Sequence, residues 1–162
     1  MRFDDLVRAY SADLYRYAFW LTRESRQAED VVQEALLRSW RGFPKLRDPA
    51  AAKAWLFSIV RNEFYRSIAK HGPPLENVDD LELADERASQ SGLEMREALM
   101  KLPPSYAEPL TLQVLGGLSC AEIAAALGIT EGATMTRLTR ARQALKRAVS
   151  GDSAKGRKGG KL

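Results

Sequence analysis

The sequence is poor in the residues that build disulfides and metal sites, with one cysteine, Cys120, and one histidine, His71. A single cysteine excludes an intrachain disulfide framework and fits a reducing compartment. One cysteine and one histidine cannot supply the ligands of a Cys/His metal site. We therefore expect neither a bound metal nor a cofactor.

Long apolar runs are also absent. No stretch approaches the length of a membrane span, and the N-terminus alternates charged and apolar residues where a signal peptide would carry an apolar segment. Apolar residues still make up 45% of the chain, which is enough for a core and excludes wholesale disorder. We expect a soluble, cytoplasmic protein with no membrane insertion of its own.

The residue sets of common catalytic sites are missing too. The chain has no Ser/His/Asp set, no glycine-rich loop of the kind that cradles phosphates, and no carboxylate pair with an evident site. An enzyme is therefore the least favoured class of function.

Positive charge is scarce in one segment only. Residues 71–92 hold 1 Lys/Arg against 6 Asp/Glu, whereas residues 1–70 hold 13 against 9 and residues 93–162 hold 11 against 6. A polyanionic partner is attracted to the outer blocks and repelled by the middle one. Because the middle segment also contains Pro73 and Pro74, we interpret it as an acidic flexible linker. A solvated loop would have the same composition.

Three helical patterns precede this linker, and no alternating strand pattern occurs anywhere in the chain. Residues 3–22 are amphipathic and rich in aromatic residues. Residues 26–41 follow Ser25, a candidate N-cap, and a third helix runs from the N-cap Asp48 to about Lys70. The apolar stripe of this third helix consists of Leu56, Val60 and Phe64.

Four further helical patterns follow the linker. Ser105 and Glu108 have the spacing of a capping box for the second of these helices, and Ser119 and Glu122 have the same spacing for the third. Thr130 is positioned to cap the last one. The expected helices cover residues 93–101, 105–116, 120–127 and 131–149.

The fold class that these patterns predict is all-α. Two small helical domains, residues 1–70 and 93–149, are joined by the linker of residues 71–92. Residues 150–162 form a basic, glycine-rich tail that we expect to be disordered.

The last two helices form a helix-turn-helix pattern, in which Ile123 and Leu127 pack on the apolar side of the following helix. The other side of that helix carries threonines and arginines. Arginine can donate two hydrogen bonds to guanine, and threonine offers a methyl group and a hydroxyl to base edges. The pattern favours DNA reading, although a solvated or protein-docking face would look similar. The outward residues are Met135, Thr136, Thr139, Arg140 and Gln143, flanked by the candidate phosphate ligands Arg137, Arg142, Lys146 and Arg147.

Two blocks of the sequence carry a family resemblance. The first contains "AEDVVQEALLRSWRGF" and "AWLFSIVRNEFYRS", and the second is "LPPSYAEPLTLQVLGGLSCAEIAAALGITEGATMTRLTRARQAL". They resemble region 2 and region 4 of the extracytoplasmic-function (ECF) sigma factors of bacterial RNA polymerase. The resemblance covers roughly residues 3–70 and 93–149, in the family's order and without a third domain between them.

This resemblance implies an alternative sigma factor, a non-enzymatic subunit that directs promoter-specific transcription initiation. Its expected partners are promoter DNA, the β′ clamp helices and β flap of core RNA polymerase, and an anti-sigma factor that holds it inactive. In the family, the segment between the domains threads along the path of nascent RNA; acidic residues fit that role or simple solubility. The alternative is a free-standing helix-turn-helix regulator with an N-terminal dimerisation or sensing domain.

The resemblance also assigns residues of the first domain. The helix "DVVQEALLRSW" matches the one that docks on the β′ clamp helices, although core packing is an equal alternative for Trp40. The loop "PKLRDP" and the helix after it match the element that captures an unstacked −10 base, with Asn62 as its polar residue. Most of the 12 aromatic residues within residues 1–65 are read as core. The implied polymerase contacts are Asp30, Gln33, Glu34, Leu37 and Trp40; the implied −10 contacts are Lys45, Leu46, Arg47, Asp48, Arg61, Asn62 and Arg66.

In the second domain, Met135, Thr136, Thr139 and Arg140 match the positions from which family members reach the −35 element. One departure is Thr134, where the family usually has an apolar β-branched residue. Met135 also stands where relatives often carry Lys or Arg. The −35 sequence is therefore not transferable from relatives.

Overall fold

The structure is a computed structural model that describes the backbone of residues 2–72 and 90–159, and the side chains of residues 2–72 and 95–150. Most of the predicted linker, residues 73–89, lies outside the described residues. Every regular element in the described ranges is helical, which confirms the all-α fold class. The elements are α1 (Phe3–Thr22), α2 (Ser25–Gly42), the short 3-10 turns η1 (Phe43–Lys45) and η2 (Pro49–Ala51), α3 (Ala52–His71), α5 (Gln90–Lys101), α6 (Pro104–Gly116), α7 (Cys120–Leu127) and α8 (Glu131–Gly159).

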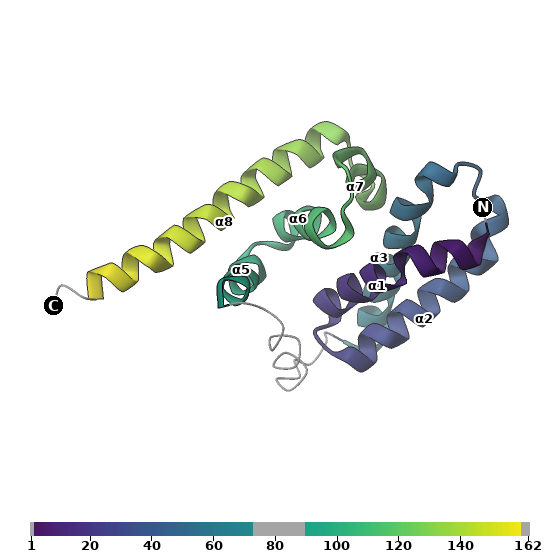
Figure 1. Cartoon of the computed structure of the whole chain (residues 1–162), viewed down its shortest axis with the longest axis horizontal. Coiled ribbons are helices and arrows are strands. Elements are labelled where there is room, and N and C mark those ends of the chain that lie inside the picture. The colour runs from purple at the N-terminus through teal and green to yellow at the C-terminus, as the bar shows by residue number, and fades with distance from the viewer. Residues whose placement is uncertain (1, 73–89, 160–162) are drawn as a thin grey trace.

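The first domain is a bundle of α1, α2 and α3, each packed against the other two (Figure 1). Large side chains of α1 and α3 fill its core, whereas α2 contributes mainly small residues that allow a close approach. The predicted stripe of α3 is buried as expected. The core residues include Leu14, Tyr17, Leu56, Phe57 and Val60 from α1 and α3, and Ala28, Val31, Val32 and Ala35 from α2.

The second domain consists of α5 to α8 (Figure 1). The predicted capping box of α7 is present, because Ser119 Oγ accepts from Glu122 N at 3.1 Å and Glu122 Oε1 accepts from Ser119 N at 3.0 Å. Gly128 ends α7 in the left-handed conformation, with φ at 68°. Thr130 then caps α8, its Oγ1 accepting from Ala133 N at 3.1 Å. These local hydrogen bonds fix the predicted helix-turn-helix.

Two predicted caps were wrong. Ser25 is the first residue of α2, and Glu24 takes the N-cap position because α1 ends only two residues earlier. Ser105 is not the N-cap of α6 either, because that helix begins at Pro104 after Pro103. The carboxylate of Glu108 binds α3 of the other domain instead of closing a capping box.

The end of α8 also differs from its prediction. The helical backbone runs to Gly159, ten residues beyond Val149, and so enters the tail predicted to be disordered. Extending an existing helix adds a hydrogen bond for each residue fixed, so no new nucleation step is needed. Residues 160–162 of that tail lie outside the described residues.

The two domains pack against each other. Helix α3 packs against α7, and α1 packs against α6 (Figure 1). Buried side chains of both domains, such as Phe57, Leu112 and Leu118, belong to one continuous apolar cluster. The structure is therefore a closed arrangement of the two helical domains.

Candidate nucleic-acid interface

The first turns of α8 present the predicted reading face to solvent. Met135 is 61% exposed, and Thr136, Thr139, Arg140 and Gln143 are exposed as well. The opposite side of the helix is held by the domain core, where Ile123 of α7, Leu138 and Ala141 are buried. The face is thus accessible and rigidly supported.

The two threonines on this face use their hydroxyl hydrogens within the helix. Thr136 Oγ1 donates to Gly132 O at 3.0 Å, and Thr139 Oγ1 donates to Met135 O at 2.9 Å. With the hydrogens directed at backbone carbonyls, each hydroxyl presents an acceptor oxygen to solvent beside its methyl group.

The charged residues around this face differ in solvent exposure and in hydrogen bonding. Arg140, Lys146 and Arg147 are exposed, whereas Arg137 is half-buried. Arg142 donates to the side-chain oxygen of Gln113 on α6, which ties it to its own domain. Arg142 and Arg137 are therefore more restrained than Lys146 and Arg147 among the predicted phosphate ligands.

Thr134, the departure from the family pattern, is fully buried behind the reading face. Its hydroxyl donates to Thr130 O at 2.9 Å. A buried hydroxyl costs little when it is hydrogen-bonded, so threonine replaces an apolar β-branched residue without leaving an unpaired polar group.

The predicted polymerase-binding residues of α2 lie on its solvent side. Leu37 is 52% exposed and Trp40 is 64% exposed. Trp40 is therefore a surface residue and not part of the core. Asp30 and Gln33 are exposed, and Glu34 is half-buried with an oxygen 3.6 Å from Arg38 Nε. An apolar pair flanked by carboxylates is therefore available on one helix.

The loop between α2 and α3 carries four predicted −10 residues. Lys45, Arg47 and Asp48 are exposed, whereas Leu46 packs against the domain core. Asp48 Oδ1 accepts from Ala50 N at 3.0 Å and caps the turn that leads into α3. The apolar anchor at Leu46 and the cap at Asp48 hold the loop on the two sides of Arg47.

On α3, Asn62 and Arg66 are exposed and lie one helical turn apart, so the structure brings them onto one face. Arg66 Nη1 donates to Glu63 Oε1 at 2.7 Å. Glu63 is buried and also pairs with Arg38 of α2, so it orients two arginines.

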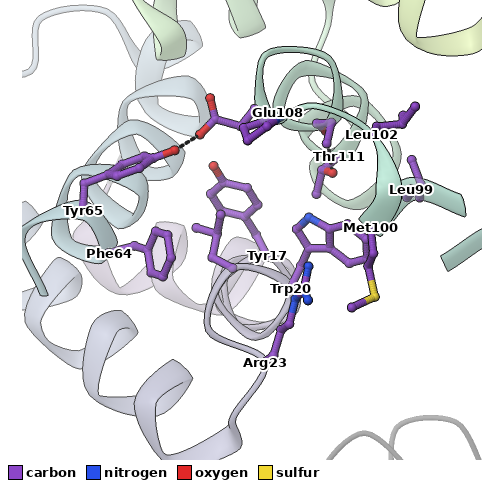
Figure 2. A pocket seen from close by; sticks show the side chains of 13 residues that line it. Tyr17, Trp20, Arg23, Phe64, Tyr65, Leu99, Met100, Leu102, Glu108 and Thr111 are labelled. Atoms are coloured by element: carbon purple, nitrogen blue, oxygen red, sulfur yellow. Dashed lines mark hydrogen bonds between the residues drawn. The ribbon is translucent and has the colours of Figure 1, made fainter. Parts of the chain in front are cut away.

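Arg61 faces the second domain rather than this surface. Its Nε and Nη2 atoms each donate to one oxygen of Glu108 at 3.2 Å, and Tyr65 Oη donates to the same carboxylate. Figure 2 shows the hydrogen bond between Tyr65 and Glu108, with the Tyr17 hydroxyl pointing toward that carboxylate. Sequence reasoning missed Glu108, because a pairing across 47 residues has no local signal.

Within the described residues, no helix is long and apolar enough to cross a membrane. In the same part of the chain, no group of three or more His, Cys, Asp or Glu side chains is placed to hold a metal ion.

Comparisons with known proteins agree with both blocks of the sequence. The sigma-70 region 2 family matches residues 6–73, and the sigma-70 region 4 family matches residues 92–145. The ECF RNA polymerase sigma factor SigM of Mycobacterium tuberculosis is 35% identical over 150 residues, which is 90% of this chain and 76% of the relative. SigM of Bacillus subtilis is 33% identical over 154 residues, covering 90% of this chain and 94% of the relative.

Two solved structures share the fold of both domains. The sigma factor RpoE of Bartonella quintana, in a complex with the anti-sigma factor NepR, has a TM-score of 0.72 and 27% identity, covering 91% of this chain and 96% of that chain. CnrH in a complex with the cytosolic domain of CnrY has a TM-score of 0.70 and 27% identity, covering 93% and 88%. With both regions matched in order and the relatives covered over most of their length, the chain belongs to the ECF RNA polymerase sigma factors, which initiate transcription and are not enzymes.

Proposed function

We propose that this sigma factor reads the −35 element with α8 and uses its first domain to bind core polymerase and hold −10 DNA open. The observation that carries the proposal is the exposed face of Met135, Thr136, Thr139 and Arg140 on a helix whose other side is buried. A major groove admits one helix, and base-edge contacts there specify sequence.

The chemistry of this face favours particular bases. Because the Thr136 and Thr139 hydrogens bind the helix backbone, their oxygens accept from the amino groups of adenine or cytosine, and their methyl groups contact thymine. Arg140 suits guanine, whose O6 and N7 accept a bidentate pair. Neighbouring bases and phosphates are contacted by Gln143, Arg137, Arg142 and Lys146.

Core polymerase binding is proposed for α2. Leu37 and Trp40 supply apolar contact area, and exposed aromatic residues are favoured anchors of protein interfaces. Asp30, Gln33 and Glu34 surround them with polar groups that suit a rim. We assign this surface to the β′ clamp helices, and the second domain to the β flap.

The −10 element is proposed to meet the loop of Lys45, Leu46, Arg47 and Asp48 together with α3. A melted strand exposes bases that a pocket can hold, and cations bind its phosphates. Asn62 is the exposed amide on this face, and Arg66 is held in place by Glu63. Arg61 joins this surface only when it leaves Glu108.

The proposed inhibitor of this protein is an anti-sigma factor. We assign the protein to the cytoplasm, where polymerase and DNA are found. The similarity to a sigma factor solved with the anti-sigma factor NepR supports this proposal. Copurification of the tagged chain from its native host tests it, with recovery of core polymerase alone as the contrary result.

The experiment for the function as a whole is in vitro transcription with core polymerase on a genomic promoter library. We expect a defined set of promoters to fire only when the protein is present. Gel filtration with core polymerase distinguishes this function from that of a free-standing regulator. A dimer that does not bind core polymerase contradicts the proposal.

A further inference from the structure

Four side chains at four-residue spacing form one stripe along α3, which we call the α3 stripe: Lys53, Phe57, Arg61 and Tyr65. Residues four apart share a helix face, so the stripe presents a single edge. All four members contact the second domain. Lys53 Nζ donates to Gly117 O at 3.1 Å, and Phe57 lies against Gly116.

The far end of the α3 stripe is an ion pair reinforced by a tyrosine. Glu108 accepts two hydrogen bonds from Arg61, and the guanidinium lies 4.7 Å from the centre of the Tyr65 ring. The Arg61 and Glu108 side chains are only 24% and 14% exposed. Bidentate pairs shielded from water are stronger than surface pairs.

Contacts with Glu108 favour the protonated forms of Arg61 and Tyr65. Burial by itself lowers the pKa of Arg61, but hydrogen bonding and charge from Glu108 outweigh it, so the pKa is raised. Burial and the hydrogen bond to Glu108 raise the pKa of Tyr65 to about 12. Arg61 therefore stays charged and Tyr65 stays a donor while the domains are closed.

The region beside the ion pair contains an unpaired polar atom. The Tyr17 hydroxyl is fully buried and has no hydrogen-bond partner among the described residues. A buried hydroxyl without a partner lowers the stability of the closed arrangement. An open pocket of about 210 Å³ lies next to it, between the two domains (Figure 2). The pocket is lined by Tyr17, Trp20, Leu21, Phe64, Leu99 and Met100, among others.

The closed arrangement is too short to span a promoter. B-form DNA rises about 3.4 Å per base pair, so elements about 25 base pairs apart lie roughly 80 Å apart. A domain of about 60 residues is only on the order of 25 Å across, yet here the −10 residue Arg61 touches the −35 domain directly. The 18 chain steps from Gly72 to Gln90 can extend to about 60 Å, which permits separation.

We propose that the α3 stripe and Glu108 form an autoinhibitory contact that keeps Arg61 from promoter DNA until the domains separate. This inference rests on the proposed −10 role of the first domain. The DNA backbone is a polyanion that attracts Arg61 and repels Glu108, so it competes with the closed arrangement. Because only the open form exposes Arg61, the apparent affinity for −10 DNA scales with the fraction of open molecules, and weakening the contact raises it until the open form dominates.

The test replaces Glu108 and leaves every proposed DNA ligand in place. Dyes on the two domains report their separation by energy transfer, and a −10 single strand reports binding in the full-length protein. We expect Glu108→Gln to lower the closed-to-open ratio by about tenfold. The affinity for the −10 single strand should rise as the open fraction rises. Glu97→Gln is the matched control, because Glu97 is exposed on α5 of the same domain.

A charge swap separates loss of the contact from loss of folding. Arg61→Glu alone should open the domains, and Arg61→Glu combined with Glu108→Arg should restore high energy transfer. Unchanged energy transfer and strand binding in Glu108→Gln overturns the autoinhibitory contact. If the wild type with core polymerase fires no promoter at all, the proposed function fails instead, so the two failures are distinguishable.

Discussion

Gly116 lies directly against the ring of Phe57. A Cβ atom added to this glycine would be 3.0 Å from Cε1 and 3.1 Å from Cζ of that ring. Such distances are shorter than nine in ten real Cβ contacts, and Phe57 is fully buried, so the ring has little room to move. The absence of one side chain on α6 therefore allows the two domains to pack this closely.

Gly116→Ala is expected to loosen the interface between the domains. Overpacking of a buried contact costs about 1–3 kcal/mol, which the protein can relieve by separating its domains. Interdomain energy transfer and thermal unfolding measure the effect. Gly132→Ala is the control, because a Cβ there meets nothing within 4 Å. Equal behaviour of the two variants would contradict the role of this contact.

Leu37→Ala and Trp40→Ala are expected to weaken core polymerase binding without lowering thermal stability, since both side chains are more than half exposed. Removing an interface anchor typically costs about 2 kcal/mol or more, which is roughly 30-fold in affinity. Fluorescence titration with core polymerase measures it. Arg8→Ala is the control, because Arg8 is exposed on α1 of the same domain and lies outside the proposed polymerase site. An equal loss from Arg8→Ala would argue against a specific site on α2.

Asn62→Ala is expected to impair promoter opening while −35 binding is retained. The exposed amide is the proposed base contact on α3, and its removal leaves α8 untouched. Permanganate reactivity near the start site should fall, whereas protection of the −35 element should stay at the wild-type level. Wild-type permanganate reactivity in the variant would remove Asn62 from the proposed site.

Arg140→Ala is expected to relax sequence preference at one −35 position, at a cost of about 1–3 kcal/mol. Arg147→Ala, on the same helix, should weaken all sequences nearly equally because it is placed for phosphates. Binding selections on randomised −35 sequences distinguish the two effects. If both variants keep the wild-type preference, Arg140 does not read a base.

Alkaline pH is expected to open the domains through Tyr65. Burial and the hydrogen bond to Glu108 raise the pKa of this phenol from 10.0 to about 12, and the part due to Glu108 exists only while the domains are closed, so the closed arrangement favours the protonated form. Its contribution is complete below about pH 10 and is lost as pH rises toward about 12. Interdomain energy transfer should be constant from about pH 7 to 9 and fall above about pH 10. Tyr65→Phe should lack this alkaline component.

The parts of the fold predicted correctly from the sequence depend on short spacings. Ser119 and Glu122 are three residues apart, so their reciprocal hydrogen bonds follow once α7 begins. The 3.6-residue period likewise places Thr139 and Arg140 opposite the buried Leu138 and Ala141. The family resemblance rested on the same local patterns.

Only the tertiary structure decided which side chains pair across the interface between the two domains. Glu108 has the spacing of a capping residue with Ser105, yet it pairs with Arg61 because docking of α6 on α3 brings opposite charges together in a partly buried place. Whether Trp40 is core or surface was also open until the packing of α2 was known, because helical spacing gives a face but not its neighbour. Local hydrogen bonds are encoded within a few residues, whereas interdomain contacts depend on how two finished surfaces fit.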